Sequence, residues 1–394
     1  MINILSIPSD NFGVGFYRNI APSNYLSKEY PNDFHIDINF NPPLFDENFL
    51  RKYDIIHFHK RINNYENIDN LFKLFKKLGI ITIMDLDDLW RFHDKHPNYR
   101  TNQILRTDLL IIDLLKRVDH VTTSTDKLAE QVKCYNQNVT IIPNAMDPEA
   151  EKLNTNHEFS ERIRFGWAGG STHYYNLKLL EGLPAYLKQK GVLDKIQFVL
   201  CGFDTRGIKE VIDSNGKIVI KPTLPQESVY NKFEQIFTDN YKTISSSYKD
   251  YLLMYNNQKE YDNLINEPYR RVWTKPVTTY TTSYNLFDVA LAPLLVNEHN
   301  ECKSNLKLIE AGFHHMPLIA QNISQYREID GTNGFLIHKK DGIYGWYEAI
   351  KYFIDNPEQI AIMGENLYNT VKDKYDIKNV SKIRIDLYNK LLNK

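Results

Sequence analysis

The chain has only three cysteines, no long apolar run and almost no net charge in its 394 residues. Cys134, Cys201 and Cys302 have no metal-binding spacing and are typical of a reducing compartment. No stretch is apolar enough to span a membrane, and the N-terminal sequence MINILSIPSD becomes polar too early for a signal peptide. We therefore expect a cytoplasmic protein. A formal net charge of −1 excludes a global attraction to nucleic acid or acidic lipid.

The composition that remains is that of an ordinary globular protein, with 42% hydrophobic and 25% charged residues. A length of 394 residues predicts two domains, each large enough for its own hydrophobic core. Short apolar runs alternate with helical patterns along most of the chain, which indicates an α/β protein.

The most informative stretch runs from Asn285 to Gln321. Leu286 to Leu291 is an apolar run typical of a buried parallel strand. Ser304 can cap a helix after it, which Pro317 ends before a further strand begins at Leu318 to Ala320. This order of elements predicts a helix N-terminus near the carboxyl end of a strand.

Such a helix N-terminus can bind phosphate, because its free backbone N–H groups and its dipole point at the anion. Lys303 and Lys307 add positive charge on one helical face, and Glu310 lies two turns beyond Lys303. A carboxylate there can accept hydrogen bonds from ribose hydroxyls. An amphipathic helix with solvated lysines would give the same pattern, so both interpretations stay open.

This stretch resembles the donor-binding segment of retaining GT-B glycosyltransferases of family 4. The resemblance rests on Glu310-Ala311, Gly312 and the turn His315-Met316-Pro317. The chain departs from the family at Cys302, where the first glutamate of a pair would stand. A bacterial and phage variant with Lys-Ser-x-x-Lys before the glutamate is more similar. The implied donor contacts in this segment are Lys303, Ser304, Asn305, Leu306, Lys307 and Glu310.

The N-terminal residues resemble a second part of the same family. Residues 2–7 predict a strand, and Gly13, Val14 and Gly15 follow it, where glycines let backbone approach a phosphate or sugar closely. The resemblance implies that this loop contacts the donor and that Arg18 reaches a phosphate. A structural ion pair is the alternative for Arg18.

Three carboxylates follow the predicted strand Ile80 to Met84, at the kind of strand end where α/β sheets bind ligands. An Asp-x-Asp motif here could hold a metal ion, but in a GT-B frame this strand belongs to the acceptor side. We therefore expect Asp87 and Asp88 to orient the acceptor hydroxyl or accept its proton. A turn with a helix N-cap would account for only one of the three carboxylates. His93 and His96 are further candidates, although lone histidines are more often structural.

The second half begins with another strand, glycine turn and helix. Ile163 to Ala168 predicts the strand, and a strand ending at Gly202 resembles the one that approaches the nucleotide in the family. The two cations with which the family holds the diphosphate are missing from the glycine turn, so Lys303 and Lys307 are expected to supply that charge. The predicted donor contacts in this half are Gly169, Gly170, Ser171, Thr172, His173 and Gly202.

The resemblance implies a GT-B fold in the α/β class, with two Rossmann-like domains facing each other across a cleft. We expect residues 1–148 to form the acceptor-side domain, 149–161 a linker and 162–375 the nucleotide-sugar-binding domain. Residues 203–270 form a long insert, with helices near 226–238 and 246–265 and many tyrosines that could form an acceptor platform or a dimer contact. Residues 376–394 are expected to cross back to the first domain as a helix.

The implied activity is transfer of a sugar, with retention, from a nucleotide diphosphate donor to a hydroxyl acceptor. The catalytic residues would be Asp87, Asp88 and Lys303. The resemblance implies no cofactor and no metal, a UDP- or GDP-sugar as co-substrate, and a glycan acceptor in surface polysaccharide synthesis. Two alternatives remain open: a phage-type enzyme acting on modified bases in DNA, favoured by the basic stretch 371–394 and the tyrosines, and a nucleotide-sugar-binding protein without catalysis. A dinucleotide-dependent oxidoreductase is disfavoured, because no Gly-x-Gly-x-x-Gly follows either first strand.

Overall fold

The computed structural model forms two compact units. It describes residues 1–63, 65–149, 153, 159–204, 208–214, 217–222, 227–239 and 268–393. The first unit consists of Met1–Glu151, Asn297–Glu310 and Thr370–Lys394, and the second of Lys152–Val296 and Ala311–Asn369. Residues 297–310, which we expected in the second domain, therefore pack as part of the first unit.

The first unit is built on a six-stranded sheet in which every neighbouring pair is parallel. Its strand order is β2-β1-β3-β4-β5-β6. The strands are β1 (Ile2–Ile7), β2 (Phe34–Ile38), β3 (Ile55–His59), β4 (Ile81–Leu86), β5 (His120–Thr123) and β6 (Val139–Ile141). Isoleucine, valine and phenylalanine dominate them, as expected for strands that are covered on both faces.

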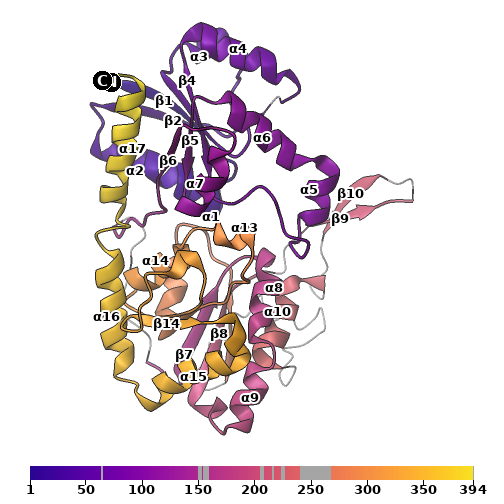
Figure 1. Ribbon diagram of the computed structural model, residues 1–394, viewed down its shortest axis with the longest axis vertical. Helices are drawn as coiled ribbons and strands as arrows, with labels where there is room; N and C mark the ends of the chain where they lie inside the picture. Colours follow the sequence, from indigo (N-terminus) through magenta and orange to yellow (C-terminus); the bar gives the residue numbers. More distant parts are fainter. Residues whose placement is uncertain are drawn as a thin grey trace. The chain divides into compact units, whose positions relative to one another are not determined.

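Alternate residues of each strand point to opposite sides of the sheet, so both of its faces are apolar, and helices cover both. Ile4, Ile55 and Ile83 pack on one side with Leu26 and Tyr388, from α2 (Ala21–Glu29) and α17 (Ile377–Leu391), which lie side by side in Figure 1. Leu5, Ile56 and Met84 pack on the other side. The helices there are α4 (Ile68–Leu78), α6 (Thr107–Arg117) and α7 (Asp126–Lys133).

The remaining helices of the first unit are short. They are α1 (Gly13–Gly15), a π-helix at Phe16–Ile20, α3 (Glu47–Leu50), α5 (Tyr99–Leu105) and α13 (Glu298–Glu301). The pattern from Ile104 to Arg117 predicts one helix, but Arg106 adopts a left-handed backbone (φ 49°) and separates α5 from α6.

The second unit also has a six-stranded, all-parallel sheet, in the order β11-β8-β7-β12-β13-β14. The strands are β7 (Ile163–Ala168), β8 (Ile196–Phe203), β11 (Tyr269–Trp273), β12 (Val289–Ala292), β13 (Leu318–Gln321) and β14 (Gly334–Ile337). Helices pack against this sheet in a core that includes Trp167 and Trp346. They are α8 (Tyr174–Leu177), α9 (Leu183–Gln189), α10 (Val229–Thr238), α15 (Gly342–Asp355) and α16 (Gln359–Val371) (Figure 1). Helix α14 (Leu306–Phe313) begins in the first unit and ends in the second.

The insert differs in part from its prediction. It contains an element that the sequence analysis did not predict, because β9 (Ile208–Ile212) and β10 (Ile218–Pro222) pair as an antiparallel hairpin. The helix expected near 226–238 is α10, whereas the one expected at 246–265 lies outside the described residues. Tyr230 and Tyr269 are buried, so neither is exposed as a stacking platform. The other tyrosines of 240–267 lie outside the described part of the chain.

None of the helices that the structure describes is both long and apolar enough to cross a membrane.

Candidate functional site

The strand order of each sheet reverses once, and open α/β sheets bind ligands at the carboxyl ends of the strands beside that reversal. In the first unit the reversal lies between β1 and β3, where Ser9 and Asp10 follow one strand and His59 ends the other. In the second unit it lies between β7 and β12, where Gly169 to His173 follow β7. Most of the predicted residues lie at these two edges or at the strand ends next to them.

Arg18 forms a buried ion pair with Asp85. Its Nε and Nη2 lie 2.8 Å from the two carboxylate oxygens, and Nη1 donates to Ile142 O at 2.7 Å and Asn144 Oδ1 at 3.0 Å. Burial would raise the pKa of Asp85, but the guanidinium outweighs it and holds that pKa well below its ordinary value. Of the two roles open to Arg18, the structure shows the ion pair. Each of its side-chain nitrogens already has a partner.

The turn that carries Arg18 is unusual. The π-helix Phe16–Ile20 buries Tyr17, Arg18 and Asn19 together. Turns of π-helix are rare in proteins, and those that do occur often lie at functional sites. Just before it, a Cβ on Gly15 would lie 1.9 Å from the Asp10 carbonyl oxygen, so glycine is required there. Gly13 has open space around the position of a Cβ. The sequence prediction of a glycine-dependent close approach is thus explained at Gly15 by contact with the protein's own backbone.

Asp87 lies at the inner end of a hydrogen-bonded chain. Its Oδ1 is 3.0 Å from His59 Nε2, and His59 Nδ1 is 2.7 Å from Ser9 Oγ. Lys60 Nζ is 3.1 Å from the same oxygen of Asp87. Burial would raise the pKa of Asp87, but Lys60 and His59 hold it well below its ordinary value. Lys60 keeps this position with φ 63°, a left-handed backbone that costs about 1–2 kcal/mol for a residue with a side chain.

Asp88 pairs with Lys303, whose Nζ lies 3.1 Å and 3.2 Å from the two carboxylate oxygens. Both side chains are partly exposed, at 23% and 19%. Burial would raise the pKa of Asp88, but Lys303 outweighs it and the pKa is lowered. The structure therefore brings all three predicted catalytic residues to one edge: Asp87 and Asp88 follow β4, and Lys303 precedes α14.

The segment around Lys303 is fixed by contacts within the first unit. The Thr125 hydroxyl donates to Cys302 O at 3.0 Å, Asn144 Nδ2 donates to Ser304 Oγ at 3.0 Å, and Asn305 Nδ2 donates to Tyr375 Oη at 2.6 Å. Helix α14 begins at Leu306, and the Asn305 carbonyl accepts from its first turn, so the helix starts later than a Ser304 cap predicts. Lys307 is half-buried, whereas Glu310 is only 3% exposed. A ribose contact of Glu310 would require its carboxylate to become accessible.

Histidines pack beside the Asp88–Lys303 pair. His299, from α13, is buried and its ring centroid lies 5.2 Å from those of both His96 and Phe92. His96 stacks on Phe92 at 4.1 Å, and His93 lies 5.8 Å from His96. Burial lowers the pKa of His96 to about 3 and that of His299 to about 4. These rings are neutral at physiological pH and act as aromatic packing.

The second unit offers a glycine turn at the end of β7. A Cβ on Gly169 would lie 2.6 Å from the Trp167 indole, and one on Gly202, at φ 93°, would lie 2.9 Å from Gly169 O. Gly170 is exposed with nothing near the position of a Cβ. Ser171 and Thr172 are exposed, and His173 is held by Asn176 Nδ2 at 3.1 Å from its Nδ1. The turn thus presents an open backbone and two hydroxyls at the carboxyl edge.

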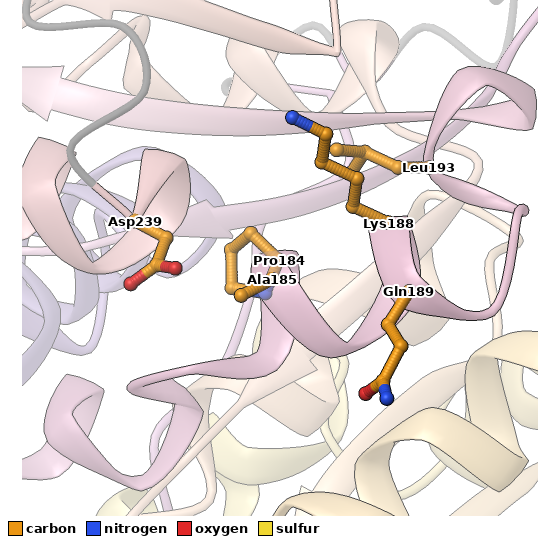
Figure 2. Close-up of a pocket in the computed structure, with 6 residues that line it drawn as sticks. All are labelled: Pro184, Ala185, Lys188, Gln189, Leu193 and Asp239. Carbon is orange, nitrogen blue, oxygen red and sulfur yellow. The ribbon is translucent and has the colours of Figure 1, made fainter.

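A shallow hollow of about 390 Å³ lies elsewhere in the second unit. Figure 2 shows its lining residues Pro184, Ala185, Lys188, Gln189, Leu193 and Asp239. Leu193 begins the short 3-10 turn Leu193–Lys195 that leads into β8, which places the hollow at the amino edge of the sheet, opposite the Gly169–His173 turn. It holds none of the predicted residues.

Sequence reasoning missed Ser9, His59 and Lys60 as members of the first site, and it did not predict Asp85 as the partner of Arg18. A usable signal was present for His59, because the apolar pattern of Tyr53 to His59 predicts a strand that this histidine ends, and α/β sheets bind ligands at such strand ends. Among the described residues, no group of three or more His, Cys, Asp or Glu side chains is arranged to hold a metal ion.

Each of the two α/β units is built on an all-parallel sheet. The second unit has the Rossmann strand order 3-2-1-4-5-6 and the first has the related order 2-1-3-4-5-6, which together give the chain a GT-B fold. No protein-family model and no curated protein matches the sequence.

Solved structures of the same fold do match. The chain is similar to sucrose-phosphate synthase from Thermosynechococcus elongatus (TM-score 0.57, 13% identity, 100% of both chains). It is similar to HepE from Anabaena, solved with UDP and glucose (TM-score 0.61, 12% identity, 98% of this chain and 99% of HepE). A glycosyltransferase from Rickettsia africae also matches (TM-score 0.61, 11% identity, 99% and 98%). At these identities the likeness establishes the fold alone.

Proposed function

We propose that the chain is a glycosyltransferase that moves a sugar from a nucleotide diphosphate donor to a hydroxyl acceptor, with retention and without a metal ion. The observation that carries the proposal is the open turn at Gly170 to Thr172, at the strand reversal of a Rossmann-type sheet. Exposed backbone and hydroxyls at this position are suited to phosphate oxygens. HepE, which shares the fold, was solved with UDP, so a uridine donor is the first to test.

The residues of the first unit would supply the remaining chemistry. The partly exposed Lys303 ammonium, together with Lys307, would stabilise the charge that develops on the departing diphosphate, as fixed positive groups do in other transferases. Asp87 and Asp88 would hold the acceptor through hydrogen bonds from its hydroxyls. Their lowered pKa values make them good hydrogen-bond acceptors but weak proton acceptors. A glycan acceptor of a surface polysaccharide is the class we favour.

No observation favours DNA as the acceptor. Arg384 of the basic stretch 371–394 is buried, with Nη1 3.2 Å from His57 Nδ1, so it is not on a binding surface. The tyrosines that motivated the idea are either buried or outside the described residues.

We expect UDP or GDP, or the corresponding sugar nucleotides, to raise the melting temperature of the protein in a thermal-shift screen of uridine, guanosine, adenosine and cytidine compounds. A ligand at 100 times its dissociation constant adds about 2.7 kcal/mol to the free energy of unfolding.

The Gly170→Val variant tests whether this ligand binds at the glycine turn. A Cβ there meets nothing and the backbone is extended (φ −86°, ψ 175°), so its ligand-free melting temperature should match the wild type.

The valine side chain would nevertheless cover the open backbone and should abolish the ligand-induced shift. Lys28→Ala, at an exposed side chain remote in sequence from every proposed contact, is the control and should keep the full shift. A full shift in Gly170→Val would contradict the placement of the donor at this turn. Binding by the wild type without turnover toward any acceptor would favour the non-catalytic binding protein.

A further inference from the structure

The strand reversal of the first unit carries a hydrogen-bonded chain of four polar residues, of which the proposed function uses only Asp87. Ser9 Oγ lies 2.7 Å from Asp10 Oδ2 and 2.7 Å from His59 Nδ1, and His59 Nε2 lies 3.0 Å from Asp87 Oδ1. Ser9 is exposed at the outer end, whereas His59 is fully buried and the Asp87 side chain is 10% exposed. The chain therefore runs from the solvent side of the sheet edge into the interior.

The hydrogen-bonded chain has fewer protons than contacts. A carboxylate can only accept hydrogen bonds, so the contact to Asp87 takes its proton from His59 and the contact to Asp10 takes its proton from Ser9. A neutral imidazole and one hydroxyl bring two protons to three contacts. One contact is then left without a proton, whichever tautomer His59 adopts. If His59 carried a second N–H proton, the hydrogen-bonded chain would have three protons in all, one for each of its three contacts.

Three carboxylates and one cation lie around His59. Asp87, which follows β4, faces its Nε2; Asp10 lies behind Ser9 after β1, and Asp85 is a neighbouring carboxylate on β4. Lys60 is the cation nearest the chain, and its ammonium pairs with Asp87 rather than with the imidazole. The left-handed backbone of Lys60 maintains this placement at an energetic cost, as is common for residues at functional sites.

We propose that Ser9, His59 and Asp87 form a proton relay that accepts the proton of the acceptor hydroxyl, an inference that rests on the proposed function. As the acceptor oxygen bonds to the sugar carbon, the nucleoside diphosphate leaves with the electron pair of the broken C–O bond. The proton of Ser9 moves from its contact with Asp10 to His59 Nδ1, and the acceptor proton takes its place on Ser9 Oγ, so that each of the three contacts then has a proton. The resulting imidazolium is held by Asp87 and returns the proton to solvent through Ser9 after the product leaves. Ser9 is the residue that touches the reacting hydroxyl of the acceptor, and His59 acts through it.

Water and azide as alternative nucleophiles test this relay, because water must lose a proton when it attacks and the azide anion has none to lose. UDP-glucose and GDP-mannose serve as donor probes, and nucleoside diphosphate release and glycosyl azide formation are measured. In His59→Gln, the water reaction should fall about 100-fold or more, the usual contribution of a positioned proton acceptor. The azide reaction should stay within about twofold of the wild type.

His59 is fully buried, so Ser9→Ala, at an exposed position, is the second variant and should show the same selective loss. His35→Gln, at an exposed histidine of the same sheet, is the matched control and should change neither reaction. Equal losses with both nucleophiles, or no loss with either, would overturn the relay. Donor binding without any reaction toward water or azide would overturn it too, since a proton acceptor here must act on water. Failure of the proposed function is distinguishable, because the wild type would then either bind no donor in the thermal-shift screen or bind one without turnover, whereas failure of the relay alone leaves the wild-type reactions intact.

Discussion

Arg18→Met should lower the free energy of unfolding of the first unit by about 3–5 kcal/mol. Methionine keeps the length of the side chain but leaves the Asp85 carboxylate buried, fully inaccessible and without its counter-charge. Arg18 also donates hydrogen bonds to Ile142 O and Asn144 Oδ1. The substitution therefore removes contacts that join the π-helix to β4 and to the residues after β6.

The measurement is unfolding in urea, monitored by hydrogen exchange and mass spectrometry, which gives the free energy of unfolding separately for peptides of each unit. Arg51→Met, which breaks the exposed pair with Glu47, is the matched control and should leave the unfolding curve almost unchanged. Arg18→Met combined with Asp85→Leu should recover part of the loss, because the uncompensated charge is then gone. A loss below about 1 kcal/mol in Arg18→Met would show that Asp85 does not depend on Arg18.

Lys303→Met should reduce turnover of the nucleotide sugar by about 10²–10³-fold, the usual effect of removing one group that stabilises developing negative charge. The diphosphate gains negative charge as the glycosidic bond breaks, and Lys303 is a partly exposed ammonium at the edge where the predicted catalytic residues meet. The loss should appear mainly in kcat, because the charge is greatest in the transition state.

Asp88→Asn separates the two partners of this pair. It leaves the Lys303 ammonium in place, so we expect donor turnover to fall less than in Lys303→Met. Lys28→Met, at a side chain that is 69% exposed, is the control for loss of a lysine charge and should have no effect. Unchanged kcat in Lys303→Met, in a protein that still turns over the donor, would contradict the role assigned to Lys303.

Local patterns predicted the individual elements well because they depend on neighbouring residues. The apolar periodicity of Ile68 to Leu78, with Gly79 after it, predicts a helix with those bounds, and the structure has α4 there with Gly79 at φ 71°. The strand at Ile163 to Ala168 also has its predicted bounds. Local patterns were less successful in the insert, where the short alternating runs of β9 and β10 are separated by polar residues.

The partners of the site residues depend on contacts far apart in sequence, and the sequence contains no local signal for them. Arg18 and Asp85 are 67 positions apart, and the choice between a phosphate contact and an ion pair depends on the π-helix that turns Arg18 inward. Lys303 and Asp88 were both predicted, but as members of different domains, and they meet because residues 297–310 pack with the first unit. The apolar pattern of Tyr53 to His59 predicts a strand but carries no local signal that its last residue belongs to a site.

The most direct test of the central claim is proton NMR of the wild-type protein incubated with UDP-glucose, GDP-mannose and representative adenosine and cytidine sugar nucleotides. The proposal predicts that one base series is consumed with release of the nucleoside diphosphate. The first sugar product should carry the anomeric configuration of the donor. A well-folded protein that neither binds nor consumes any of these nucleotide sugars would contradict the proposal, although its GT-B fold would stand.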